Sequence, residues 1–443
     1  MRTRPFREPV NPTESMSSSG GATESEVAWR GNLRAVGIAQ LAAVLGWMIS
    51  VPFVPIYLRD VGVVDDRSLA LFTGLAGTAG GIGSMLGAPI WGAISDRRGR
   101  RVALISSMIA GGATLLLLGG AQGPWEIVLL RFANGSMSAT VLTASALIAS
   151  GTPRAKLSYA FGSLSMAIYA ASTIGPLVGG LLTNAVGVRL AFEVGGVVFA
   201  LSAILVLTSV HEPRSAESRA GGSGPSPAAE TGPASVVESG PAAETHEMPA
   251  RSEPVRPDVR RALVPVIVCV GLFAASSWLY QPFLVVRAVN EFGAASSLLT
   301  GAALGLMGLA STIGAVGSSR LAQSIGFRHL LSSAGVVLAV DLVLSAAVPG
   351  VLSVVCGAAI AGLMIGAATP ALLALIALEA PAASRGSLIG IGMGIQAAGS
   401  AVGPVLGGVL AASAGVGAAI AGAGVIALAA AALVKVGVRE PLH

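Results

Sequence analysis

The chain has 443 residues, of which 53% are hydrophobic and 11% charged, and its formal net charge is +5. Soluble domains carry roughly 25% charged residues, so this composition excludes soluble enzymes, disordered proteins and nucleic-acid-binding proteins as classes. Cys269 and Cys356 lie in separate apolar stretches, and the four histidines are scattered. We therefore expect no disulfide framework, no metal site and no cofactor.

Residues 1–33 are polar and contain Pro, Ser and Glu. Their charged start is not closely followed by the apolar region of a secretion signal. We interpret this segment as a disordered cytoplasmic tail, within which Met16 is an alternative start.

Apolar stretches long enough to cross a hydrocarbon core of ~30 Å as helices then recur along the chain. There are twelve, at about 35–58, 69–94, 102–121, 125–149, 157–183, 188–210, 262–289, 297–319, 329–347, 350–377, 386–413 and 415–436. A polar block, 211–259, divides them six and six, and its composition is typical of a disordered linker. We predict an all-α integral membrane protein with six-helix bundles at 34–210 and 260–437 and a cytoplasmic tail at 438–443.

The distribution of basic residues predicts the orientation of these helices. With the N-terminus inside, 22 of the 27 Lys and Arg residues fall on inner segments and four on outer ones, namely Arg59, Arg67, Arg189 and Arg287. We therefore expect a multi-pass protein of the cell membrane whose two termini are both cytoplasmic.

The two halves repeat each other at a nearly constant offset. Trp47 and Pro52-Phe53 recur as Trp278 and Pro282-Phe283, and Gly99-Arg100-Arg101 has an echo at Gly326-Phe327-Arg328. Gly162-x8-Ala171-x3-Gly175-Pro176-x2-Gly179-Gly180 recurs 228 residues later as Gly390-x8-Gly399-x3-Gly403-Pro404-x2-Gly407-Gly408. Duplicated six-helix halves usually enclose a site near the middle of the membrane and rock about it.

Three of these segments resemble signatures of the major facilitator superfamily. Residues 92–101, Gly-Ala-Ile-Ser-Asp-Arg-Arg-Gly-Arg-Arg, resemble its loop signature, and Leu130-Arg131-Phe132-Ala133-Asn134-Gly135 is similar to a second signature. The glycine-rich pattern at 162–180 resembles that of its drug/proton antiporters, although Ala171 replaces a glycine and 35–58 lacks the acid that several exporters carry. The resemblance implies a monomeric transporter of two pseudo-symmetric bundles that exports hydrophobic small molecules in exchange for protons by alternating access.

The loop signature comprises Gly92, Asp96, Arg97, Gly99, Arg100 and Arg101. Its basic residues fix topology. Asp96 is placed to face the positive N-terminal end of the helix that begins near Arg385, so we expect a latch between halves, with plain helix capping as the alternative.

Arg131 and Asp341 are the candidates for proton coupling. A charge within the bilayer is costly, so Arg131 should face a cavity or a partner, the structural alternative being a static pair with Glu126 or Glu193. Asp341 is the one acid well inside an apolar stretch. Its position suits a proton carrier, but the simpler interpretation, which we favour slightly, is an acid near the outer end that reaches interfacial water.

The glycines and prolines of the antiporter-like pattern have a packing role, because small residues let helix backbones approach closely. They are Gly162, Gly175, Pro176, Gly179 and Gly180, with Gly399, Gly403, Pro404, Gly407 and Gly408 in the second half. We expect them to seal the outer end against the opposite half with two-fold packing. The direction of transport follows from the resemblance alone.

Polar and aromatic residues deep in the apolar stretches are the candidates for binding a lipophilic substrate. They are Gln40, Trp47, Asn134, Tyr169, Trp278, Tyr280, Gln281 and Gln396. Any of them is alternatively an interfacial aromatic residue or an interhelical hydrogen bond. The few acids favour neutral or anionic lipophilic compounds over polycations.

Other functions remain as alternatives. A proton-coupled importer of a nutrient would not be expected to carry the antiporter-like pattern. A membrane-embedded enzyme would need acid, base or nucleophile clusters at one depth, and a sensor would need a foldable output domain. No nucleotide-binding loop of the type G-x-x-x-x-G-K-[ST] occurs in the sequence.

Overall fold

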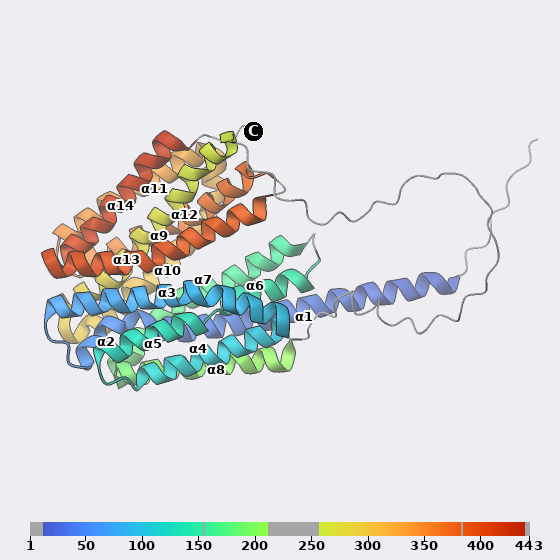
Figure 1. The fold of residues 1–443 in the computed structure, drawn as a ribbon, viewed down its shortest axis with the longest axis horizontal. Helices are drawn as coiled ribbons and strands as arrows, with labels where there is room; N and C mark the ends of the chain where they lie inside the picture. Colours follow the sequence, from blue (N-terminus) through green and yellow to red (C-terminus); the bar gives the residue numbers. More distant parts are fainter. Residues whose placement is uncertain (1–11, 154–155, 211–256, 382–383, 439–443) are drawn as a thin grey trace, which may run out of the picture.

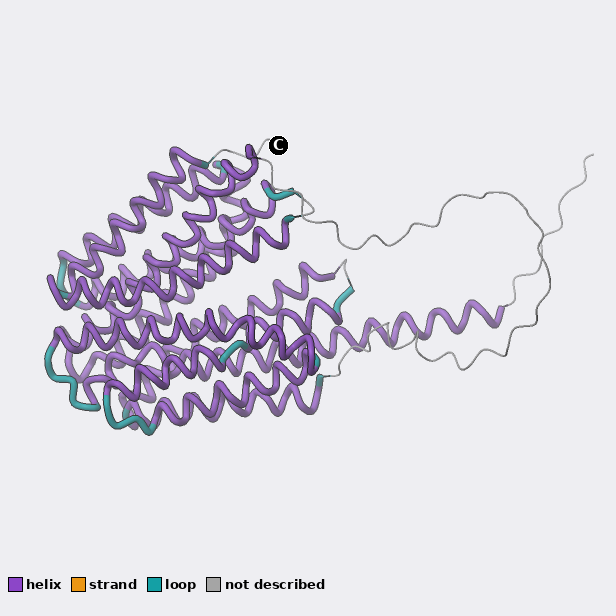
Figure 2. The backbone as a smooth tube through the Cα atoms, in the orientation of Figure 1, coloured by secondary structure: helices purple, strands orange, loops and turns teal. Residues whose placement is uncertain are grey.

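A computed structural model describes residues 12–153, 156–210, 257–381 and 384–438, and these residues form two bundles of long helices (Figure 1). The N-bundle consists of α1 (Pro12–Ser50), η1 (Val51–Phe53), α2 (Val54–Asp60), α3 (Asp66–Arg98), α4 (Arg100–Gly119), α5 (Pro124–Met137), α6 (Thr140–Gly151), α7 (Leu157–Val186) and α8 (Val188–Ser209). The C-bundle consists of α9 (Pro257–Phe292), η4 (Gly293–Ala295), α10 (Ser296–Ile325), α11 (Phe327–Ala347), α12 (Val351–Glu379), α13 (Arg385–Ala414) and α14 (Val416–Gly437). Helices and short turns make up the whole described part of the chain (Figure 2).

Eleven continuous helical spans of the described residues are long and apolar enough to cross a membrane. One of them, Leu263–Ile325, has 63 residues. As one straight helix it would be about 95 Å long, three times the hydrocarbon core, but the chain reverses at η4, where Gly293 has a φ of +52°. With α9 and α10 counted separately, the described residues make the twelve crossings that the sequence predicts.

Two of the crossings are interrupted. The first consists of α1, η1 and α2; Pro52 lies in the short η1 segment and Pro55 in the first turn of α2, and neither can donate a backbone hydrogen bond. The fourth consists of α5 and α6, which break at Ser138 and Ala139. The second break lies about two helical turns after Arg131. The side chains of this region therefore belong to two separately oriented segments.

The N-terminal segment differs from the prediction of a disordered tail over 1–33, because α1 begins at Pro12. Once a helix is nucleated, each further residue adds a hydrogen bond, so a strongly anchored membrane helix can extend into a polar segment. The C-bundle likewise starts at Pro257, inside the predicted linker of 211–259. Residues 1–11, 211–256 and 439–443 lie outside the described part of the chain.

The two bundles have the same internal packing. In the N-bundle α4 packs on α8, α3 on α5 and α1 on α7; their counterparts in the C-bundle are α11 on α14, α10 on α12 and α9 on α13. The bundles meet through two equivalent pairs, α3 with α13 and α7 with α10. The structure is therefore pseudo-two-fold, as the sequence repeat predicts.

The bundles converge at one end and separate toward the other (Figure 1). The closed end carries Arg59, Asp66 and Asn290, and the open end carries the loop signature at 92–101. At the closed end, Arg67 Nε donates to the Ala412 carbonyl at 3.0 Å, and deeper in the interface Thr78 Oγ1 donates to the Ala401 carbonyl at 2.7 Å. Both hydrogen bonds join the first half of α3 to the last half of α13.

Candidate functional site

Two adjoining cavities of about 330 and 320 Å³ lie between the bundles. They share the lining residues Trp47, Met48, Gly77, Arg131, Ser172 and Trp278. Because α1, α3, α5 and α7 contribute from one bundle and α9, α10, α12 and α13 from the other, any movement of the bundles relative to each other changes the shape of this space. Its volume is within the range of sites for small organic molecules.

Arg131 is buried, with 6% of its surface exposed, and its side chain points into these cavities rather than toward lipid. Its Nη1 donates to Asn134 Oδ1 at 3.2 Å, and its guanidinium lies 5.9 Å from the centre of the Trp47 ring. It has no ion pair with any carboxylate of the described residues, so the alternative of a static pair with Glu126 or Glu193 does not hold in this structure.

Asn134 fixes the position of Arg131. Its Nδ2 donates to Thr114 Oγ1 at 3.0 Å, to Ser138 Oγ at 3.2 Å and to the Gly111 carbonyl at 3.3 Å. These contacts tie the amide to α4 and leave its oxygen directed at Arg131. A Cβ at Gly80 would lie 2.5 Å from Arg131 Nη2, so the guanidinium packs directly against the backbone of α3 and would have to shift if a side chain replaced this glycine.

The predicted binding residues separate into three groups. Trp47, Tyr169, Trp278 and Gln281 line the larger cavity and Asn134 the smaller one, whereas Gln396 lines a separate space of about 50 Å³. Gln40 and Tyr280 line none of these. Gln40 Nε2 donates to Thr140 Oγ1 at 3.2 Å, which makes it an interhelical hydrogen bond, and Tyr280 is fully buried within the C-bundle.

The burial of Asp341 argues against the interpretation slightly favoured from the sequence, an acid near the outer end that reaches interfacial water. Asp341 is 8% exposed in α11, beside Gly357 of α12 and near Tyr280 of α9. Its Oδ2 and the Tyr280 hydroxyl have no hydrogen-bond partner among the described residues. Asp341 does not line the cavities, so a role in the transport cycle would have to act through the interior of the C-bundle.

Most glycines of the glycine-rich pattern lie at close contacts between helices. A Cβ at Gly180 would lie 2.6 Å from the Ser297 carbonyl oxygen of α10, and one at Gly408 would lie 3.1 Å from the Ala70 carbonyl oxygen of α3. Among the glycines of this pattern, these two make contacts between the bundles. Within each bundle, Gly175 and Gly179 pack on α1, and Gly399, Gly403 and Gly407 pack on α9.

Two prolines and one glycine of this pattern behave differently. Pro176 and Pro404 line the larger cavity. Gly162 is exposed, and a Cβ there would meet nothing within 4 Å.

The loop signature has a clear structural role at the open end. Gly99 has a φ of +94°, in a region that residues with a Cβ avoid, and it reverses the chain between α3 and α4. Arg101 Nη2 donates to the Leu207 carbonyl at 2.5 Å, at the negative C-terminal end of α8.

The remaining members of the signature make fewer contacts. Gly92 has open space beside it, and Arg100 follows the turn at the start of α4. Asp96, Arg97 and Arg98 are exposed, and no contact from Asp96 to the described part of α13 is formed in this open state. The predicted latch therefore stays a prediction for the state in which this end is closed.

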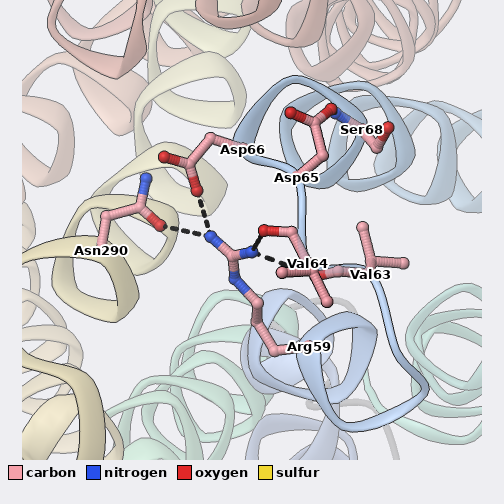
Figure 3. Close-up of polar contacts among 7 residues, drawn as sticks. All are labelled: Arg59, Val63, Val64, Asp65, Asp66, Ser68 and Asn290. Atoms are coloured by element: carbon pink, nitrogen blue, oxygen red, sulfur yellow. Dashed lines mark hydrogen bonds and ion pairs between the residues drawn. The ribbon is translucent and has the colours of Figure 1, made fainter.

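A polar cluster at the closed end was missed by the sequence analysis (Figure 3). Arg59 Nη2 donates a hydrogen bond to Asn290 Oδ1 at 3.0 Å, and this contact joins the two bundles. The same guanidinium forms an ion pair with Asp66. Its Nη1 donates to the Val63 carbonyl at 3.1 Å and to the Val64 carbonyl. Sequence reasoning used Arg59 only as a topology signal and gave no indication that Asn290 is its partner.

Comparison with known proteins gives a consistent result. A sequence model of the Major Facilitator Superfamily matches residues 36–264 and 266–443. This chain belongs to the major facilitator superfamily. The match and the eleven long apolar helical spans of the described residues indicate a multi-pass membrane protein of a transporter family rather than of an enzyme family.

Individual relatives within the superfamily are similar over part of the chain. Multidrug resistance protein MdtG of Proteus mirabilis is 35% identical over 184 residues, which are 42% of this chain and 46% of that protein. MdtG of a Rahnella species is 33% identical over 196 residues, 43% of this chain and 48% of that protein. The chain thus matches less than half the length of these relatives.

A solved structure supports the fold. A bacterial homologue of the human lysosomal transporter Spinster, in an inward-facing and unoccupied conformation, superposes with a TM-score of 0.69 at 14% identity, covering 93% of this chain and 97% of that one. At this identity the likeness shows the major facilitator fold alone. Within the described residues, no group of three or more His, Cys, Asp or Glu side chains is placed to hold a metal ion.

Proposed function

We propose that this transporter exports hydrophobic small molecules in exchange for protons, by alternating opening of the two ends of the space between the bundles. The observation that carries the proposal is the apolar cavity around one buried arginine, placed where both bundles contribute walls. The partial similarity to MdtG multidrug resistance proteins supports export as the direction. The distribution of Lys and Arg supports cytoplasmic termini, which makes the open end of this structure the cytoplasmic end.

The cycle requires the closed end to part and the open end to close. Close approach of Gly180 to α10 and of Gly408 to α3 seals the closed end, and Asp96 would latch the opposite end in the alternate state. Transport needs no nucleotide in this scheme, and one monomer contains the complete cavity.

Proton coupling is assigned to two residues in different bundles. Arg131 faces the cavity and is within reach of a bound substrate, whereas Asp341 is a buried carboxyl that can take up a proton without losing an existing contact of its Oδ2. For exchange, protonation of Asp341 in the C-bundle must then change the position of the C-bundle relative to the N-bundle.

Dye accumulation in a pump-deficient bacterial host tests the proposal, with a neutral, an anionic and a cationic lipophilic dye. We expect cells that make the protein to accumulate less of at least one dye, and a proton uncoupler to abolish the difference. Arg131→Gln should reduce export at least about tenfold, since hydrogen bonds to charged groups contribute ~1.5–3 kcal/mol. Asp341→Asn should abolish the uncoupler-sensitive part.

Lys156→Gln is the matched control, because Lys156 is an exposed cation at the start of α7 and away from the cavity. Greater accumulation than in control cells would indicate an importer. Unchanged accumulation of all three dyes would contradict transport of hydrophobic compounds.

A further inference from the structure

We infer that the cavity selects amphipathic organic anions, molecules with an apolar body and a single carboxylate or sulfonate group that binds Arg131. The inference deepens the proposed function by naming its substrate class, and it rests on that function only for the fate of the bound molecule. Binding itself follows from the charges and the shape of the cavity.

The first step of the argument is the charge balance. Among the described residues that line the two adjoining cavities, Arg131 is the one charged side chain. Arg131 is buried, with only 6% of its surface exposed, and yet it has no carboxylate partner among the described residues. A buried cation without a counterion is unfavourable, so a ligand that brings a negative charge is stabilised there and one that brings a positive charge is repelled.

The second step is the direction of the donors. The guanidinium group has five N–H donors in a planar fork. One hydrogen bond, to Asn134 Oδ1, occupies part of the fork, and the glycine backbone at Gly80 covers one side of it. The Trp47 ring offers a cation–π contact at 5.9 Å, which compensates only part of the charge. The remaining donors face the cavity, and an oxyanion is the ligand that suits them.

The third step is the rest of the lining. Trp47, Trp278 and Tyr169 present aromatic surface from α1, α9 and α7. Met48 and Met307 add flexible apolar side chains, which adapt to bodies of different shape. An organic acid with a compact apolar body therefore fits the cavity: its acidic group meets Arg131, and its body meets the aromatic and methionine side chains.

The fourth step limits the number of negative charges. The repeat relates Gly135 to Gly362, 227 residues later, and the same offset relates Arg131 to Ala358. Ala358 is fully buried. The C-bundle thus contributes no second cation at the equivalent position, and the site is built for monoanions.

The test is a comparison of three probes that share a naphthalene body: naphthylacetate, naphthylethanol and naphthylmethylammonium. Their binding to the purified full-length protein in detergent is measured by isothermal titration calorimetry at neutral pH. We expect the anion to bind at least about tenfold more tightly than the cation, with the alcohol in between. In Arg131→Gln the anion should lose its advantage over the alcohol, while the control Lys156→Gln should retain it.

A second variant keeps the arginine. Ser172 lines both cavities together with Arg131, so Ser172→Asp places a carboxylate in the same space. This variant should lose the preference for the anion and bind the cation better than the wild type does, even if Arg131→Gln cannot be purified.

Equal binding of the three probes to the wild type, or an anion preference that survives in Arg131→Gln or Ser172→Asp, would overturn the inference. The outcome is separable from the proposed function. Export of neutral or cationic dyes without anion-selective binding would leave the exporter standing and remove the substrate class. Anion-selective binding without export of any dye would support the substrate class and contradict the proposed export.

Discussion

The N-bundle and the C-bundle share a backbone plan but place their charges differently. At the open end they are equivalent: Gly99 and Gly326 have φ values of +94° and +83°, and Arg101 and Arg328 each donate to a carbonyl at the end of the last helix of their own bundle. The conserved features within this one chain are those that reverse the chain and cap helices. Such features depend on backbone geometry, which duplication preserves.

Charged side chains diverge between the same two bundles. Arg131 of the N-bundle corresponds to Ala358, while Asp341 of the C-bundle corresponds to Thr114, which accepts a hydrogen bond from Asn134. One bundle thus directs a cation into the cavity, and the other buries an acid away from it. The backbone frame of the two bundles is therefore symmetric, whereas the charged side chains within it differ from one bundle to the other.

The largest expected effect comes from the two glycine contacts between bundles. In Gly180→Val the new Cβ meets the Ser297 carbonyl oxygen at 2.6 Å, so α7 and α10 must move apart. Overpacking costs typically about 1–3 kcal/mol, a shift of roughly fivefold to hundredfold toward the state with this end parted. Gly408→Val should shift the population less, because its Cβ has 3.1 Å to the Ala70 carbonyl oxygen.

Distances between spin labels at Val64→Cys and Ala294→Cys, with Cys356 replaced by serine, report the separation of this end. Both positions are exposed, one in each bundle. Gly162→Val is the matched control, since its Cβ meets nothing within 4 Å, and it should leave the distances unchanged. A shift in Gly162→Val as large as in Gly180→Val would show that the contact between bundles is not the cause.

An intermediate effect is expected from the polar cluster at the same end. Arg59 hydrogen-bonds Asn290 across the bundles, whereas Arg189 pairs with Asp60 at 2.8 Å inside the N-bundle. The hydrogen bond to Asn290 is the contact that spans the bundles, and a hydrogen bond of this kind contributes ~0.5–1.5 kcal/mol, so Arg59→Gln should raise the parted population by up to about tenfold. Arg189→Gln should not.

The same pair of spin labels measures both variants. Asn290→Ala isolates the contact between bundles, because it leaves the bonds from Arg59 to Asp66 and Val63 in place. If Arg59→Gln and Arg189→Gln moved the distances equally, the cluster would be a local surface feature and not a clasp between bundles.

The sequence predicts the helices and their duplication well, because both follow from long-range composition and spacing. Twelve apolar stretches could only become crossings, and the offset between Trp47 and Trp278 fixed which helices correspond. The placement of Arg131 away from lipid was also predictable, since a charge that faces acyl chains is costly, although the sequence left open whether it faces a cavity or a partner.

Side-chain direction and helix interruptions were not predictable in the same way. Tyr280 and Gln281 are adjacent in α9, yet Gln281 lines the cavity and Tyr280 is buried in its own bundle. A boundary error of one residue rotates a helix by about 100°, which is enough to exchange two such neighbours. Gly80 and Met307 were overlooked because a glycine and an apolar residue carry no signal of function on their own.

The smallest expected effect concerns the start of α3, where the two bundles again differ. Asp65 Oδ2 accepts from the Ser68 backbone N–H at 2.8 Å, and this hydrogen bond lowers the pKa of the Asp65 carboxyl (Figure 3). Its counterpart at the start of α10 is Ala295, which has no side chain that could cap the helix. Because the pKa is lower in the folded state, the cap stabilises α3 above the unfolded value of about 3.9 and is lost as the pH falls through the lowered value.

Hydrogen exchange of the amides in the first turns of α3 and α10 measures this difference. At neutral pH the first turn of α3 should exchange more slowly than that of α10, and Asp65→Ala should bring the two rates together. Asp65→Asn keeps an oxygen acceptor at the cap and removes the titrating group. It should therefore preserve slow exchange in α3 and abolish its loss at low pH, and equal protection of α3 and α10 in the wild type would contradict a role for the cap.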